Sequence, residues 1–324
     1  MGTEFADKSA EMFKALADGE TGTFRSSLRQ VFQLSPQVPP AERAALSNEI
    51  APLLSPQDGD LELVADLAVL AGALVEGGVP AGTAGVQVMR MLHSWAGSID
   101  TRREAGGQHS VARRLGLAAK TMLTDAEVRA AVRADEHMLF DLEVAAGRLR
   151  WNVGEFHQVA RLLMMADAVS ALVLDRRSGR GFRVAFDGVW SNFQLHTLLV
   201  DALVGAEGRG LEGERPCSGC VAIESGRPQP THDATEELHE VWSLWDYKGR
   251  RIDLTDSPAD FPLHAGERVI VLGMKESALE SWTPGYHCHD RIRAHLTVRA
   301  ELPPEETTGL WSRIAMPEGA GDSA

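Results

Sequence analysis

The hydrophobic residues of this chain change their spacing near residue 170, and this change constrains the fold more than any other feature. Before that point apolar side chains recur every three or four residues, as in Leu63, Leu67 and Leu70, which is typical of a helix with a buried face. After it, short apolar runs lie between turn-rich segments, which is typical of strands. The sequence therefore predicts an α+β protein, with an all-helical N-terminal half followed by a strand-rich α+β C-terminal half.

Proline and glycine stops divide the first half into helices. Helical spacing recurs in the segments 24–34, 41–54, 85–97 and 124–149. Because no repeat unit of fixed length is visible, the sequence leaves open whether these helices form a bundle or an irregular solenoid. We expect a helical domain over 1–168, a mixed α+β domain with mainly antiparallel strands over 169–302, and a partly disordered tail over 303–324.

Two helix starts carry the pattern of a capping box preceded by a tryptophan. A capping residue is followed three positions later by Glu or Gln, and the tryptophan before the cap can pack on an apolar residue beyond it. The residues are Asn152 with Glu155 and Trp151 with Phe156 at the first start, and Ser191 with Gln194 and Trp190 with Leu195 at the second. Both patterns predict that the tryptophans stabilise the fold rather than grip a ligand.

The second half contains several strand signals. Two apolar runs around a glycine-rich turn predict a hairpin of residues 170–175 and 181–187, and a second hairpin is expected around residues 248–251. Residues 268–273 are predicted to form a buried strand. Residues 291–302 alternate between apolar and polar side chains, which also predicts a strand. Helices are expected at residues 192–204 and from Asp233 onward.

Composition and charge exclude several classes of protein. The formal net charge is −14, which disfavours a general affinity for nucleic acid or for an anionic membrane, since both depend on a positive field. Neither a membrane-spanning apolar run nor a secretory signal is visible. The chain has 3 cysteines, too few for a disulfide framework. We expect a cytoplasmic protein, and the residue usage is typical of a GC-rich bacterial genome.

The strongest chemical signal is the combination of a CxxC motif with two nearby histidines. Cys217 and Cys220 are separated by a Ser-Gly turn, while His287 and His289 would project from one face of an extended segment. Together they could form a structural zinc site with two sulfur and two nitrogen ligands. The alternative is a loop with small buried cysteines and solvated histidines.

Two other interpretations of the CxxC motif are not favoured. Zinc deaminases need a glutamate two residues after the histidine that lies upstream of the motif, and Leu198 occupies that position after His196. A thioredoxin-like redox motif needs an apolar strand before it and a helix after it, and the sequence shows neither. His196 itself lies on an apolar helix, where a core histidine bonded to a backbone carbonyl explains it as well as a functional role.

One concentrated basic feature occurs in this acidic chain. Arg291, Arg293 and Arg299, with His295 between them, would lie along one face of a strand. Guanidinium groups so arranged can hold carboxylate or phosphate through paired hydrogen bonds. A solvated outer face of a sheet is the alternative.

These observations favour an interaction or accessory protein of the cytoplasm, with a binding surface formed jointly by the helical and the strand-rich domains. The partner would be another protein or a small anionic ligand, and neither nucleic acid nor a membrane is expected. The alternative is a zinc-dependent enzyme, a hydrolase acting on a small polar substrate, with His287 and His289 among the metal ligands.

Overall fold

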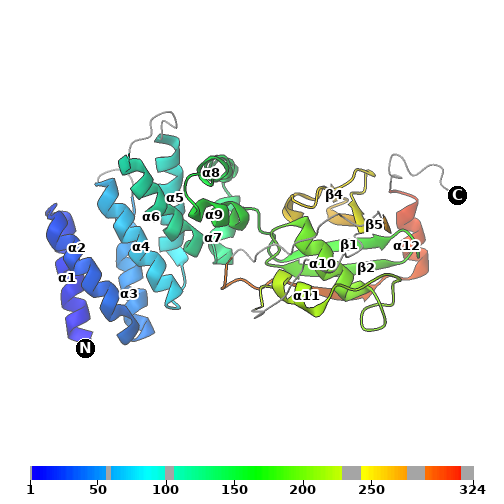
Figure 1. The fold of residues 1–324 in the computed structure, drawn as a ribbon, viewed down its shortest axis with the longest axis horizontal. Coiled ribbons are helices and arrows are strands. Elements are labelled where there is room, and N and C mark those ends of the chain that lie inside the picture. Colours follow the sequence, from blue (N-terminus) through cyan, green and yellow to red (C-terminus); the bar gives the residue numbers. More distant parts are fainter. Residues whose placement is uncertain (1, 56–59, 99–105, 228–241, 276–288, 315–324) are drawn as a thin grey trace. The chain divides into compact units, whose positions relative to one another are not determined.

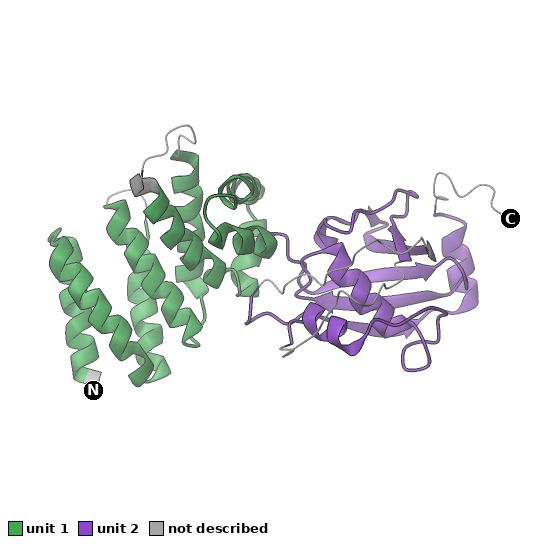
Figure 2. Cartoon of the chain, in the orientation of Figure 1, with its two compact units in different colours: residues 1–163 green, residues 164–324 purple. Residues whose placement is uncertain are grey.

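The computed structural model describes residues 2–55, 60–98, 106–227, 242–275 and 289–314. The chain divides into two compact units, Met1–Leu163 and Met164–Ala324 (Figure 2). The first unit is helical, and the second contains a sheet with helices. The predicted α+β class, with helices first and a strand-rich half second, is therefore confirmed. The division falls slightly before the predicted position after residue 168.

The first unit consists of helices joined by short connections (Figure 1). Aspartates cap several of them, since Asp60, Asp125 and Asp135 each accept a backbone N–H of the first turn, which satisfies a donor that the helix leaves open. The α-helices are α1 (Gly2–Ala17), α2 (Thr21–Leu34), α3 (Pro40–Ile50), α4 (Leu61–Glu76), α5 (Gly82–Ser98), α6 (Gly106–Met122), α7 (Ala126–Arg133), α8 (Glu136–Leu149) and α9 (Glu155–Leu163).

These helices form two layers. In the layer here called the front layer, α2 packs on α4, α4 on α6 and α6 on α9. In a back layer α3 packs on α5 and α5 on α8, and α1 packs on α2. Glu62 near the start of α4 bonds Arg114 in the middle of α6, and Glu76 at the end of α4 bonds Thr121 near the end of α6. The two helices therefore run in the same direction. This layered order is that of an irregular solenoid, which decides between the two arrangements left open by the sequence.

The first of the two predicted capping boxes is wrong. Helix α9 begins at Glu155, so this residue is not at its third position, and the side chain of Trp151 is 74% exposed. Phe156 is fully buried, and a Cβ added to Gly116 of α6 would come within 2.9 Å of its ring. The close approach to another helix positions Phe156, so Trp151 is not needed to cover it.

The second capping box is confirmed. Helix α10 (Asn192–Leu203) begins directly after Ser191, whose hydroxyl accepts the N–H of Gln194 at 3.2 Å. The Gln194 side chain in turn accepts the N–H of Trp190 at 2.9 Å. Both bonds are local, which is why the sequence alone could predict them.

The second unit is built on a mixed sheet with the strand order β3-β5-β1-β2-β6, while β4 pairs with β5 at one end. Strands β1 and β5 are parallel and all other neighbours are antiparallel. The first predicted hairpin and the buried strand are confirmed as β1 with β2 and as β5. The strands are β1 (Val169–Asp175), β2 (Gly181–Asp187), β3 (Trp242–Trp245), β4 (Leu263–His264), β5 (Glu267–Lys275) and β6 (His295–Glu301).

Both faces of this sheet are covered. Val173 and other inward residues of one face pack with Leu195 and Leu199 of α10. The opposite face, with Leu172 and Leu174, packs with α12 (Pro304–Trp311). A further short helix, α11 (Ser218–Glu224), packs against α10. Helix α12 lies within the segment 303–324 that the sequence predicts as a partly disordered tail.

Some expected elements lie outside the described residues or are shorter than expected. The helix expected from Asp233 falls in the segment 228–241, which is not described. Of the second hairpin, β3 is present and Trp245 pairs with Arg251 in an isolated bridge. None of the helices in the described residues is long and apolar enough to cross a membrane.

Candidate functional site in the helical unit

The two cysteines of the CxxC motif lie together in the second unit. Cys217 directly precedes α11, and its sulfur accepts the backbone N–H of Cys220 at 3.2 Å. The two sulfurs are 3.1 Å apart, with Cys220 fully buried and Cys217 half-buried. Helix α11 thus begins within the motif and extends beyond it, whereas the sequence showed no helix after the motif.

The predicted histidine ligands are only partly described. His287 lies outside the described residues, and Nδ1 of His289 accepts the backbone N–H of Arg291 at 3.3 Å. Within the described ranges, no three His, Cys, Asp or Glu side chains form a group that could hold a metal ion. Two thiolates bound tetrahedrally to zinc at ~2.3 Å would lie ~3.8 Å apart, so binding zinc would require the two sulfurs to separate slightly. The zinc hypothesis stays a prediction.

The predicted basic stripe does not lie on one strand. Strand β6 begins at His295, so Arg291 and Arg293 precede it, and the Arg293 guanidinium donates to the carbonyls of Asp290 and Ile292. His295 and Arg299 are exposed on β6, with Arg299 at the irregularity in its pairing with β2. The four side chains are therefore spread over a loop and an edge strand, and their role in binding stays a prediction.

His196 is a structural residue of the core. Its Nε2 accepts the backbone N–H of Trp242 at 3.0 Å, so its partner is a donor on β3 rather than the carbonyl expected from the sequence. Burial, which penalises the charged imidazolium, lowers the pKa of His196 to about 4. The neutral ring thus joins α10 to the first residue of β3.

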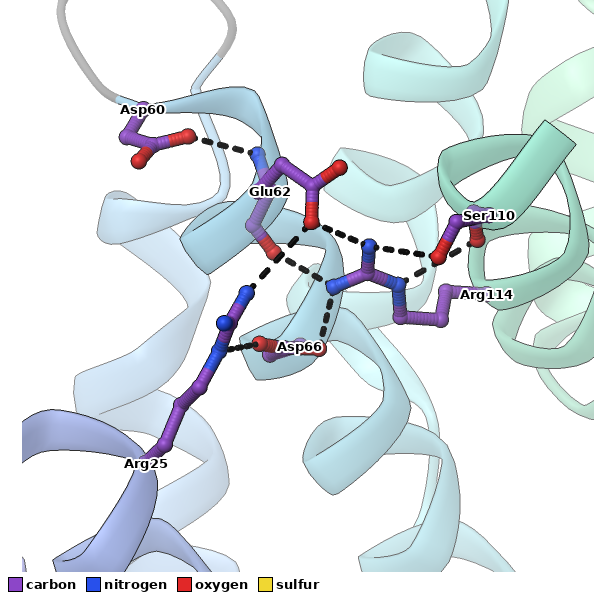
Figure 3. Close-up of polar contacts among 6 residues, drawn as sticks. All are labelled: Arg25, Asp60, Glu62, Asp66, Ser110 and Arg114. Atoms are coloured by element: carbon purple, nitrogen blue, oxygen red, sulfur yellow. Dashed lines mark hydrogen bonds and ion pairs between the residues drawn. The ribbon is translucent and has the colours of Figure 1, made fainter. Parts of the chain in front are cut away.

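A different group of polar residues gathers on the front layer of the helical unit, where α2, α4 and α6 meet. Figure 3 shows two arginines from the outer helices pointing at two carboxylates of α4. Arg25 donates to Asp66 at 2.9 Å and lies 3.4 Å from Glu62. Arg114 donates to the same two carboxylates at 2.5 and 2.6 Å. This four-residue group, here called the ion cluster, joins three helices.

Arg114 is the central cation of the ion cluster. Its guanidinium also donates to the carbonyl of Glu62 at 3.0 Å and to the hydroxyl of Ser110 at 3.1 Å. Burial opposes the charged form, but the hydrogen bonds to Glu62 and Asp66 outweigh it and raise the pKa of Arg114 above its ordinary value. Such multiple charge-assisted hydrogen bonds hold the guanidinium group of Arg114 in one orientation.

The ion cluster forms one wall of a hollow of about 490 Å³. Arg29 lies on the same wall of α2 as Arg25, one turn further on, and it has no hydrogen-bond or ion-pair partner among the described residues. Phe32, which is 48% exposed, and Leu28 supply apolar surface to the same hollow. The hollow thus combines an unpaired cation with exposed apolar side chains.

A second hollow, of about 650 Å³, lies along the same layer between α6 and α9. Arg113 donates to Glu155 at 3.1 Å across it, whereas Lys120 has no such partner among the described residues. Leu117, between these two positions on α6, is 36% exposed. The hollow is lined by His109, Arg113, Lys120, Asn152, Val153, Gly154, Glu155, His157, Gln158 and Arg161.

A third hollow, of about 620 Å³, lies in the second unit at the end of the parallel strands β1 and β5. Ligands often bind at this position in sheets with parallel strands. Here, however, the charged side chains bind one another: Asp175 accepts the N–H of Ser178, Arg180 pairs with Glu301, and Arg177 pairs with Glu212. This hollow therefore offers a ligand fewer open charges than the front layer does.

Sequence reasoning missed the front layer although a local signal was present. Arg25, Leu28, Arg29 and Phe32 recur at the spacing that places side chains on one helix face, and half of them are basic. Such a mixed face is usually solvated, and the charge of −14 for the whole chain gave no reason to expect a local excess of cations.

Comparison of the chain with protein-family models, with curated proteins and with solved structures gives no significant match.

Proposed function

We propose that the helical unit is a binding module whose front layer holds an acidic, extended segment of another protein. The observation that carries this proposal is Arg29, an exposed cation that shares a hollow with Phe32 and has no partner among the described residues. The proposal concerns the helical unit alone. The surface formed jointly with the strand-rich unit stays a prediction.

Charge supports a partner rich in carboxylates. The two hollows of the front layer are lined by six basic side chains against three acidic ones: Arg25, Arg29, Arg113, Arg114, Lys120 and Arg161 against Glu62, Asp66 and Glu155. This local excess contrasts with the net charge of −14. A short acidic segment can use the local field, whereas a long polyanion would also meet the repulsion of the remaining chain.

The arrangement of the helices supports an extended occupant. The central helix α4 is buried except for one line of side chains that includes Asp66, Val69 and Ala73, and α2 and α6 flank this line. The exposed side chains of Phe32 and Leu117 add apolar surface on either side. Apolar anchors surrounded by polar contacts are the usual source of affinity in such interfaces, so the segment should carry large apolar residues among its acidic ones.

The ion cluster limits what the arginines can contribute. Arg25 and Arg114 already bind carboxylates of the chain, so a partner gains most from Arg29 and Lys120. Exposed ion pairs contribute roughly 0.2 to 1 kcal/mol each. Charge should therefore decide selectivity and the rate of association more than affinity, and binding should weaken as salt is added.

A selection from short random peptides displayed against the full chain tests the proposal. We expect enrichment of Asp and Glu next to Trp, Phe or Leu. The charge reversals Arg29→Glu and Lys120→Glu should each weaken a selected peptide by roughly three- to tenfold, since an attraction becomes a repulsion. The measurement is fluorescence anisotropy of labelled peptide at low and high salt.

Arg90→Glu is the matched control. Arg90 is exposed on α5 of the back layer and, like Arg29, has no partner among the described residues, so the same change of charge should leave peptide binding intact. Selected peptides without acidic enrichment, or equal losses from Arg90→Glu and Arg29→Glu, would contradict the proposal.

We propose that this binding takes place in the cytoplasm, since 3 cysteines are too few for the disulfide framework of an oxidising compartment. The alternative of a zinc-dependent hydrolase stays a prediction. Metal analysis of the purified protein tests it.

A further inference from the structure

The cysteine pair of the second unit is independent of the binding module and carries chemistry of its own. Cys217 and Cys220 have sulfurs 3.1 Å apart and are not joined in a disulfide. A disulfide bond is ~2.05 Å long, so a movement of about 1 Å would bring the sulfurs to bonding distance. The same separation is shorter than the ~3.8 Å that tetrahedral zinc would impose on two thiolates at ~2.3 Å.

The two cysteines differ in their access to solvent. Cys217 is half-buried, whereas Cys220 is fully buried. Cys217 is the more exposed of the two residues, so an incoming reagent should reach it before it reaches Cys220. This asymmetry assigns the attacking role to Cys217 and the resolving role to Cys220.

The surroundings hold the pair in place. The N–H of Cys220 bonds the sulfur of Cys217 at 3.2 Å, which keeps the two residues of the turn facing one another. At the other end of α11, the carbonyl of Glu224 accepts a bond from the Gln194 side chain at 2.5 Å, and Gln194 belongs to the capping box of α10. Since α11 is tied to a core helix, bond formation needs movement of the sulfurs rather than of the helix.

We propose that Cys217 and Cys220 form a reversible dithiol pair that exchanges with disulfide substrates. The Cys217 thiolate attacks one sulfur of a disulfide RSSR, which forms a mixed disulfide and releases one thiolate RS⁻. The Cys220 thiolate then attacks the Cys217 sulfur, forms the internal disulfide and expels the second RS⁻. The protein loses two thiol protons and two electrons, and one RSSR becomes two RSH. A dithiol reductant reverses both steps.

Glutathione disulfide serves as the probe, with the folded full chain analysed by intact mass and by thiol counting. The unchanged protein should lose the Cys217 and Cys220 thiols and retain no glutathione on either of these two residues. Cys220→Ala, which keeps the buried position apolar, should retain one glutathione on Cys217. Cys217→Ser should react at least about tenfold more slowly, because its remaining thiol of the pair is buried.

Cys288→Ser is the matched control, since it removes the third cysteine of the chain and should form the internal disulfide as the unchanged protein does. Circular dichroism establishes that each variant is folded. The proposal is overturned if Cys288→Ser prevents internal disulfide formation, or if the unchanged protein keeps glutathione on Cys217. It is also overturned if protein purified without a histidine tag carries about one equivalent of zinc that protects both thiols, the result expected for a structural zinc site.

Discussion

Replacing His196 by leucine should change how the stability of the second unit depends on pH. The imidazole is 6% exposed, and the backbone N–H of Trp242 donates to its Nε2 at 3.0 Å. Because burial penalises the charged form, the pKa of His196 falls from 6.5 to about 4. The folded protein therefore keeps this ring neutral at pH values at which the unfolded chain binds a proton.

The sign and size of the effect follow from the two pKa values. Since the unfolded state binds the proton more tightly, stability is present above pH 6.5 and is lost as the pH falls toward 4. The full difference between the two pKa values corresponds to roughly 3 kcal/mol, of which roughly 2 kcal/mol should be lost by pH 5. This loss comes in addition to those from other groups that titrate in the same range.

The variant His196→Leu separates this contribution from the others. Without the ring the N–H of Trp242 loses its acceptor, so the variant should be less stable at pH 7.5 by roughly 1 to 3 kcal/mol. The variant has no imidazole that could bind a proton at this position. The stability advantage of the unchanged protein over the variant should therefore shrink by ~2 kcal/mol between pH 7.5 and pH 5. The same substitution at the exposed His295 is the control and should reproduce the pH dependence of the unchanged protein.

Urea unfolding followed by tryptophan fluorescence measures this difference, because most of the 7 tryptophans of the chain belong to the second unit. The reasoning would be refuted if the difference in free energy of unfolding between His196→Leu and the unchanged protein stayed constant from pH 7.5 to pH 5. It would mean that the folded unit admits the proton to the ring without cost.

Three further substitutions test the packing. Trp151→Ala should cost less than ~0.5 kcal/mol in urea unfolding, because the side chain is 74% exposed; a loss of several kcal/mol would restore the predicted packing on the next helix. Gly188→Ala should cost roughly 1 to 3 kcal/mol, since φ is +66° and the new Cβ would lie 2.6 Å from the carbonyl oxygen of Arg293. Gly309→Ala is its control, because no described atom lies within 4 Å of that Cβ. Arg114→Gln should lower the thermal stability of the helical unit by roughly 1 to 2 kcal/mol, since Glu62 and Asp66 would then share Arg25 alone; an unchanged melting temperature would show that the ion cluster contributes no net stability.

The sequence by itself determined the features whose causes are local. Hydrophobic spacing separates the helical half from the strand-rich half, because a side chain's direction repeats with the period of its own element. The hairpin of β1 and β2 follows from two apolar runs around a tight turn. The capping box of Ser191 and Gln194 was predictable because both of its bonds join residues four positions apart or fewer.

Only the tertiary structure decided the features that depend on distant segments. Helix α9 begins later than its pattern predicts, and the Phe156 side chain at its start packs closely against Gly116 of another helix. The parallel pairing of β1 with β5 joins strands that no local signal connects. The front layer is the strongest case, because its cations come from α2, α6 and α9. Their spacing in the chain does not predict which of them pair with a carboxylate. Nor does it predict that Arg29 has no partner among the described residues. Charge balance in a fold is settled by contacts across space, and these arise only when the helices pack.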